Sequence, residues 1–480
     1  MPVVDDIHEL VRRLCDSKSE KRSAAAKRLR KLHHSEAGPA ILEALKKEVW
    51  DVRTWKAQFE MILALGELGC QDATHFHWEL TKVETPNTIV YVALGDALVR
   101  LCSQGKSDVA CVFQLTQTDN FSLVDGAFKP NILLIITDQQ HAGMLSCAGN
   151  RYLQTPNLDS LARTGTRFER AYCGNPVCVP SRFCMLSGTM PSHIGMETNG
   201  IGRIGFMKGG QAARWKDEDM ADTFTRKGVE FIERNKDEPF FLYFATHDIH
   251  VPRVPHQRFV GQTTMGPRGD VIVQFDACVR ELLGTLDRLR LTDNTLVILS
   301  SDNGPVLDDG YKDFAVEKLG DHKPAGPWRG GKYTIWEGGT RMPFIVRWPE
   351  CIKPGVSEAL VSQVDFCASF AALTGQQLGA TDAPDSFNVL PALLGESLTG
   401  REYVLEHSGR VTIRQGQWKF IPGAEGGAGK KSNRGPQTEQ LYDLANDPAE
   451  TTNVAAQHPD IAKTLSVKLE QLQTQKGSRS

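Results

Sequence analysis

Residues 129–140 read Lys-Pro-Asn-Ile-Leu-Leu-Ile-Ile-Thr-Asp-Gln-Gln, and this stretch sets the architecture that the rest of the chain follows. An almost continuous apolar run that ends in polar residues is typical of a buried parallel strand. Two later runs have the same form, at residues 240–245 and 295–299. Helical periodicity separates the runs, at residues 157–163 and 271–289. This alternation predicts an α/β fold with a mainly parallel sheet flanked by helices.

Polar side chains follow each of these predicted strands. Asp138 and Gln139 come directly after the first run, His250 comes shortly after the second, and Asp302 and Asn303 follow the third. The carboxyl ends of parallel strands meet at one edge of a sheet, where open α/β folds bind their ligands. The sequence therefore predicts that these five side chains gather in one site.

The first part of the chain, residues 1–125, has a helical pattern instead. Similar helical segments begin at Arg22, Thr54 and Asn87, so the pattern recurs at a period of about 33 residues. This predicts an all-α region, either of HEAT-like repeats or of a plain helical bundle. Both forms favour a packing surface or a surface for a protein partner over a catalytic site.

The remaining chain divides into two further predicted domains. Residues 126–375 form the α/β domain, and residues 376–480 form a small C-terminal α+β subdomain with an alternating strand at 412–420 and a polar helix near 459–475. The polar, glycine-rich stretch at 424–437 predicts a loop.

Composition excludes several classes of protein. The net charge of −3 argues against binding to nucleic acid, which usually requires a basic excess. No apolar run approaches the ~18 residues of a membrane span, so no transmembrane segment is expected. The eleven cysteines form no CxxC pair, and the N-terminal residues resemble no secretory signal. These features favour a reducing compartment, and we expect a cytoplasmic protein.

The stretch Cys178-Val-Pro-Ser-Arg182, followed by a helical pattern, is the most specific chemical signal. A helix N-terminus favours anions through its free backbone N–H groups, and an arginine adds a fork of donors for a tetrahedral oxyanion. A cysteine in this position is also a candidate for a lowered pKa. Asp138, Asp302 and Asn303 can each offer an oxygen ligand to one hard cation, and oxygen ligands without a His or Cys cluster favour Ca²⁺ or Mg²⁺ over zinc.

These residues together resemble the type I sulfatase family, which belongs to the alkaline phosphatase superfamily. The resemblance covers about residues 129–460. It rests on matching motifs in the same order along the chain: Lys129–Asp138, Thr155–Ala162, Cys178–Arg182 with Ser187–Thr189, Ser301–Gly304, Gly330–Arg341 and Leu441–Pro448.

The resemblance implies roles for individual residues. Cys178 would be oxidised by a formylglycine-generating enzyme to formylglycine, whose hydrate is the nucleophile. A calcium ion, with magnesium as the alternative, would be held by Asp138, Gln139, residue 178, Asp302 and Asn303. Gln139 stands where many members have a second aspartate.

Other residues would act on the substrate, a small-molecule or carbohydrate sulfate ester. Arg182 would bind the formylglycine end of the site, Lys332 would contact sulfate, and His250 would protonate the leaving oxygen. His193, Asp308, Asp309 and His322 lie close to these motifs in the chain and are candidates for supporting or substrate-side positions. Many bacterial relatives are exported, so a periplasmic or secreted location is the alternative to the cytoplasm.

One element of the family pattern is missing. Members carry a Gly-Lys-Trp-His strand end between the cysteine motif and the histidine, and this chain has none between Cys178 and His250. We interpret this as an internal deletion of one strand and its flanking helices. Losing one charge-stabilising donor typically costs ~10²–10³ in rate. The sequence thus leaves three functions open: an active sulfatase, a phosphonate or phosphate ester hydrolase, and an impaired sulfatase-like protein with a helical partner-binding module.

Overall fold

The computed structural model describes residues 7–49, 51–81, 90, 93, 94, 97, 98, 100, 101, 130–193, 216–311, 313–349, 351–423, 438–475 and 477–479. They form two compact units. One contains residues 1–129 with 372–377, and the other contains residues 130–371 with 378–480. No helix in these ranges is long and apolar enough to cross a membrane.

The first unit is helical and has its own apolar core. Helix α4 packs against α2 and α3, and fully buried side chains such as Leu29, Ile41 and Met61 fill the space between them. The predicted repeat that begins at Asn87 falls largely outside the described residues, so the HEAT-like pattern stays a prediction. The helices are α1 (Ile7–Arg13), α2 (Ser19–Lys31), α3 (Gly38–Glu48), α4 (Trp55–Glu67) and α5 (Ala73–Thr81).

The second unit is built on a six-stranded sheet with the order β3-β1-β4-β5-β2-β6. Strand β1 pairs in parallel with both β3 and β4, and β2 pairs in parallel with β6, whereas β5 runs against its two neighbours. The predicted α/β fold with a mainly parallel sheet is confirmed. The strands are β1 (Asn131–Thr137), β2 (Thr166–Tyr172), β3 (Phe241–Ala245), β4 (Thr295–Ser301), β5 (Phe344–Arg347) and β6 (Gly355–Ser362).

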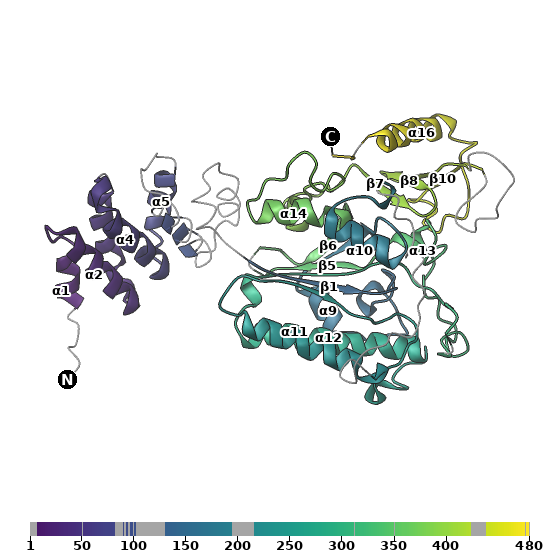
Figure 1. The fold of residues 1–480 in the computed structure, drawn as a ribbon, viewed down its shortest axis with the longest axis horizontal. Helices are drawn as coiled ribbons and strands as arrows, with labels where there is room; N and C mark the ends of the chain where they lie inside the picture. Colours follow the sequence, from purple (N-terminus) through teal and green to yellow (C-terminus); the bar gives the residue numbers. More distant parts are fainter. Residues whose placement is uncertain are drawn as a thin grey trace, which may run out of the picture. The chain divides into compact units, whose positions relative to one another are not determined.

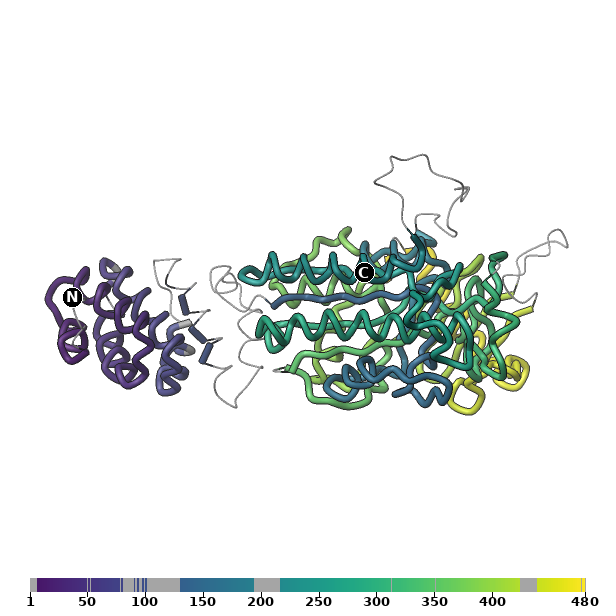
Figure 2. Tube along the Cα trace, turned by 90° about the horizontal axis from the view of Figure 1, so that it is seen from below, coloured from purple at the N-terminus to yellow at the C-terminus, as the bar shows by residue number. Residues whose placement is uncertain are grey.

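Helices cover both faces of this sheet (Figure 1). On one face lie α9 (Pro156–Arg163), α11 (Met220–Arg234) and α12 (Pro267–Arg288), whose apolar side chains pack against β1 and β4. Helices α11 and α12 run alongside each other across this face (Figure 2). On the other face lie α10 (Cys178–Ser187) and α14 (Phe366–Leu373).

Strand β3 is less buried than its apolar sequence predicts. In the described part of the chain it pairs only with β1 and so forms an edge of the sheet. The side chain of Phe241 is 47% exposed, whereas every residue of the central strands β1 and β4 is buried. A strand with a neighbour on one side only cannot bury both faces as a central strand does.

A second sheet of four antiparallel strands follows, with the order β10-β9-β8-β7. Helix α16 packs against it through Leu465, Leu469 and Leu472. This sheet belongs to the same compact unit as the six-stranded sheet, and the predicted domain boundary at 376 stays a prediction. The elements are α13 (Glu337–Thr340), α15 (Leu390–Leu393), β7 (Tyr403–His407), β8 (Val411–Gln415), β9 (Trp418–Ile421), β10 (Gln440–Asp443) and α16 (Pro459–Thr474).

Short 3₁₀ helices connect the larger elements. They cover Ser35–Ala37, Val52–Thr54, Ser146–Ala148, Pro191–His193, Asp217–Asp219, Gln257–Phe259, Thr292–Asn294 and Gln363–Asp365.

Candidate active site

The predicted site residues meet where β1 and β4 end. Thr137 and Ser301 are partners in the last register position of this parallel pair. The residues that follow them, Asp138 and Asp302, therefore leave the sheet side by side. Helix α10 begins at Cys178, and the Sγ atom of Cys178 lies 3.5 Å from Oδ1 of Asp138.

Arg182 bridges the two carboxylates. Its Nε donates to Oδ2 of Asp302 at 2.7 Å, and its Nη2 donates to Oδ2 of Asp138 at 3.0 Å. Arg182 lies one helical turn after Cys178, so helix α10 places both residues on the same side of the site. Ser181 connects the same turn of helix α10 to the end of β4, because its hydroxyl donates to the backbone carbonyl of Asp302 at 2.5 Å.

The two carboxylates are poorly stabilised by protein groups alone. Burial raises the pKa of Asp138, an effect that the charges of Arg182 and Lys332 only partly offset. Burial and the charge of Asp138 raise the pKa of Asp302 to about 7. Two buried carboxylates with one bridging arginine leave negative charge uncompensated, and this environment favours a cation.

The neighbouring amides have free oxygen atoms. Among the described residues, neither side-chain amide atom of Gln139 nor the Oδ1 atom of Asn303 has a hydrogen-bond partner, and all three atoms are buried. The backbone of Gln139 has a φ of 63° and donates its N–H to Oδ1 of Asp302 at 3.3 Å. Unpaired buried polar groups are costly, and oxygen atoms of this kind are the ligands that hard cations prefer. These residues therefore fit a divalent cation.

The Cys178 thiol does not have the lowered pKa that its position predicts. Burial raises the pKa of Cys178 well above its ordinary value, and the charges of Asp302 and Asp138 raise it further. These effects outweigh the helix N-terminus and the nearby Arg182. The Sγ atom donates weakly to Asp138, and burial beside two carboxylates disfavours a thiolate at this position.

His250 and Lys332 lie on the open side of this cluster. The imidazole Nδ1 of His250 donates to the carbonyl of Val251 at 2.6 Å, which directs Nε2 toward Nζ of Lys332 at 3.4 Å. Burial and the charge of Lys332 lower the pKa of His250. One ligand atom from each of Asp138, Cys178 and His250 lies within 4.8 Å of the others.

Asp309 holds Lys332 in place. Asp309 is among the candidates that the sequence suggests, because it lies close to the motifs in the chain. Nζ of Lys332 lies 3.2 Å from Oδ2 of Asp309, which also accepts from the hydroxyl of Tyr333 at 3.3 Å. Burial on its own would lower the pKa of Lys332, but the surrounding acidic groups, Asp309 and Asp138 among them, raise it. The sequence placed the Asp308-Asp309 pair shortly after the Ser301–Gly304 motif, but it did not predict that Asp309 contacts Lys332.

The other candidates make different contacts. Nδ1 of His193 lies 2.7 Å from Oδ2 of Asp385, and the ring of His322 packs edge-on against Tyr152. Oδ1 of Asp308 accepts from the backbone N–H of Gly310 at 2.8 Å. These contacts stabilise neighbouring loops.

The missing Gly-Lys-Trp-His element has no substitute among the described residues around Cys178. Within that part of the chain, the cations that act on the thiol are Lys332 and Arg182. Residues 199–210, which occupy the corresponding interval of the sequence, lie outside the described residues.

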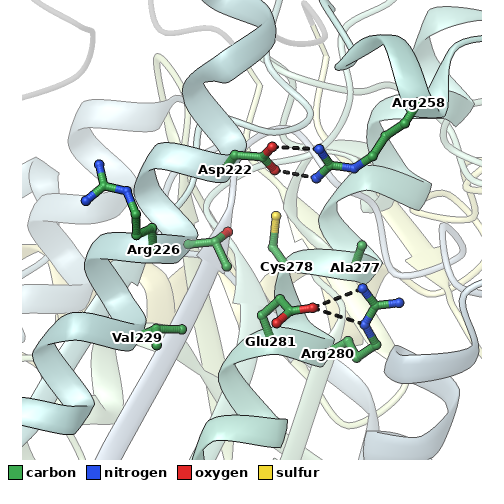
Figure 3. A pocket seen from close by; sticks show the side chains of 9 residues that line it. Asp222, Arg226, Val229, Arg258, Ala277, Cys278, Arg280 and Glu281 are labelled. Atoms are coloured by element: carbon green, nitrogen blue, oxygen red, sulfur yellow. Dashed lines mark hydrogen bonds and ion pairs between the residues drawn. The ribbon is translucent and has the colours of Figure 1, made fainter.

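A cavity of about 370 Å³ lies apart from these residues, between α11 and α12 (Figure 3). Its three arginines are already paired with acidic side chains: Arg258 contacts Asp222, Arg226 contacts Glu230 at 2.6 Å, and Arg280 contacts Glu281 at 2.9 Å. Cys278 lies at its wall, and burial raises the pKa of that thiol to about 12. None of the predicted site residues lines this cavity.

Comparisons with known proteins agree with the geometry. The family model described as sulfatase matches residues 130–208 and 199–376, which together make up more than half of the chain. An N-acetylgalactosamine-6-O-sulfatase of Bacteroides thetaiotaomicron is 51% identical over 282 residues, which cover 58% of this chain and 55% of that protein. Human arylsulfatase A is 27% identical over 449 residues, which cover 71% of this chain and 87% of that protein.

Solved structures give the same result. A structure described under the metabolism of multiple glycosaminoglycans by Bacteroides thetaiotaomicron is 36% identical, with a TM-score of 0.67. The match covers 73% of this chain and all of that chain. From the matched motifs, the geometry at the ends of β1 and β4 and these comparisons, we conclude that the chain belongs to the sulfatase family.

Proposed function

We propose that this chain hydrolyses a sulfate ester of a carbohydrate, with formylglycine made from Cys178 and a bound calcium ion. The observation that carries the proposal is the cluster of Asp138, Asp302, Gln139 and Asn303, with buried carboxylates and unpaired amide oxygens, beside Cys178 and Lys332. Two named relatives, at 51% and 28% identity, are sulfatases of N-acetylgalactosamine-6-sulfate. We therefore propose a 6-O-sulfated amino sugar as the substrate class.

The cation and formylglycine would supply different chemistry. The cation, held by Asp138, Gln139, Asp302 and Asn303, would supply positive charge to the sulfate oxygens. Formylglycine, in its hydrated form, would supply one hydroxyl as nucleophile and a second whose deprotonation releases sulfate. The high pKa of the Cys178 thiol supports this assignment, because the unmodified side chain has little thiolate character.

The remaining residues would bind the substrate and move protons. Lys332 would hold sulfate oxygens, and its contact with Asp309 keeps the ammonium group at the site before the substrate arrives. Arg182 would fix the two carboxylates relative to residue 178. His250 would protonate the leaving oxygen through Nε2, because its Nδ1 is already engaged by Val251. An incoming sulfate would raise the pKa of His250 by placing negative charge beside it.

Location and partners are also predictions. We expect a cytoplasmic enzyme, with export as the alternative. The helical unit of residues 1–129 is expected to bind a protein partner.

Expression with a formylglycine-generating enzyme tests the proposal. Mass spectrometry of the peptide with residue 178 should show conversion of the thiol to the aldehyde, and a 6-O-sulfated N-acetylgalactosamine should release sulfate. Cys178→Ala should abolish release. A converted protein that releases sulfate from no substrate would contradict the proposal and favour the impaired protein that the missing element suggests.

A further inference from the structure

The segment that carries Lys332, residues 329–341, is held between the active site and the four-stranded sheet. We call it the lysine segment. On the active-site side, the backbone N–H of Lys332 donates to the carbonyl of Pro305 at 2.8 Å, and that of Tyr333 donates to Pro176 at 2.9 Å. Pro305 follows the Asn303 loop, and Pro176 precedes Cys178. The backbone at Lys332 is therefore tied to both halves of the site.

The four-stranded sheet holds the middle of the lysine segment. The hydroxyl of Ser408, just after β7, donates to the carbonyl of Tyr333 at 2.7 Å. This bond is on the residue next to Lys332. The segment also packs closely against the Asn303 loop, because a Cβ atom at Gly304 would lie 2.0 Å from the carbonyl oxygen of Gly338.

A buried ionic cluster holds the end of the lysine segment. Nζ of Lys419, on β9, lies 3.3 Å from Glu337, 3.3 Å from Glu406 and 3.2 Å from Glu450. The backbone N–H of Glu337 also donates to Glu450 at 2.7 Å. All four side chains are fully buried.

Glu450, a member of this cluster, also contacts the beginning of the lysine segment. Nη1 of Arg329 donates to the backbone carbonyl of Glu450 at 3.1 Å and to the hydroxyl of Tyr442 at 3.1 Å. Its guanidinium lies over the ring of Trp336, 4.0 Å from the centroid. Both ends of the segment are therefore anchored to the strands and loops of the four-stranded sheet.

We infer that Ser408 and Lys419 are positioning residues for the sulfate-binding Lys332, acting through Tyr333 and Glu337. A buried ion cluster contributes little net stability, because the cost of removing its charges from water offsets much of their mutual attraction. The cluster does, however, hold its members in one geometry. The geometry here fixes the backbone that presents Lys332. The four-stranded sheet is thus part of the sulfate-binding apparatus.

This inference rests on the proposed function, since it assumes that Lys332 binds sulfate. Ser408→Ala is the sharpest variant, because it removes one hydroxyl and leaves the ionic cluster intact. Loss of one such bond predicts an increase of about 3- to 10-fold in KM and in the Kd for inorganic sulfate, with kcat much less affected. Ser408→Thr, which keeps the hydroxyl, should restore both constants. The control is Ser466→Ala on α16, whose hydroxyl contacts Glu470 of the same helix at 3.5 Å, and it should change neither constant.

A second variant tests the cluster itself. Glu450→Gln keeps the size of the side chain and removes one charge beside Lys419. Like Ser408→Ala, it should weaken sulfate binding. Thermal unfolding of each variant is measured alongside. A lower Tm with unchanged KM and unchanged sulfate affinity would show a purely structural role and overturn the inference.

Sulfate binding by calorimetry, on the full chain with residue 178 converted and calcium present, separates this inference from the proposed function. If the protein binds sulfate without turnover, hydrolysis is refuted, and weaker binding by Ser408→Ala still supports the positioning role. If the protein neither binds sulfate nor turns over, both are overturned.

Discussion

At the scale of single residues, the surroundings of Cys178 bear on the proposed conversion of this residue to formylglycine. Its thiol is buried, its pKa is raised, and it points at a carboxylate. These are poor conditions for a thiolate, yet the surrounding carboxylates, amide oxygens and arginine are already arranged. This arrangement supports the proposal that residue 178 acts as formylglycine, and the start of helix α10 places the residue at the site.

His193 allows a prediction on pH and stability. Its hydrogen bond to Asp385 raises the pKa of His193 against the opposing effect of burial, and the same contact lowers the pKa of Asp385. A histidine whose folded-state pKa is raised contributes stability that is complete below its unfolded pKa of about 6.5 and is lost as pH rises through the folded value. His193→Gln should therefore lower Tm more at pH 5.5 than at pH 8.5.

Thermal unfolding of both proteins at the two pH values checks this prediction. The matched control is His458→Gln, because His458 packs against Trp418 elsewhere in the same unit. An equal loss of Tm at both pH values would show that the His193–Asp385 pair contributes through its shape and not through its charge.

At the scale of elements, the ends of β1 and β4 bring together the residues that are proposed to hold the cation. Strand pairing fixes Asp138 beside Asp302, and the residues after them supply amide oxygens. Removing calcium with a chelator should therefore abolish sulfate release and lower Tm. A ligand at a hundredfold excess over its Kd stabilises a protein by about 2.7 kcal/mol. Restored calcium should recover both activity and Tm, and a chelator that changes neither would refute a cation at this place.

The exposed edge of β3 leads to a prediction on association. Phe241 is 47% exposed on a strand that carries aromatic and aliphatic side chains and no charged residue, and such edges tend to pair with other chains. Phe241→Lys should reduce association at high protein concentration, measured by light scattering. It should lower stability by about 0.5–1.5 kcal/mol through loss of the aromatic contact with Phe370, in addition to the loss from the buried part of the Phe241 ring. Leu398→Lys, at a loop position that is 89% exposed, is the control and should leave association unchanged.

At the scale of the whole molecule, the sequence predicted the parts that depend on local pattern. The apolar runs of β1 and β4 and the polar residues at their ends were sufficient to predict both the parallel sheet and the meeting of Asp138 with Asp302. The edge position of β3 was not predictable, because a run of apolar residues does not show which neighbours a strand will have. The lysine segment shows a similar limit. Its motif indicates Lys332, but Ser408 and Lys419 are distant in the sequence and contact the segment only in the folded chain.

The two compact units should also unfold separately. The core of the first unit, around Met61, and the core beneath the six-stranded sheet, around Phe275, are built from different parts of the chain. Both side chains are fully buried. Met61→Ala should destabilise the first unit by about 2–5 kcal/mol, lower only one calorimetric transition, and leave sulfate release unchanged. Phe275→Ala should lower the other transition and reduce sulfate release, because α12 packs beneath the strands that carry the site. A single transition that moves with both variants would show that the two units unfold as one, and sulfate release would then depend on both cores.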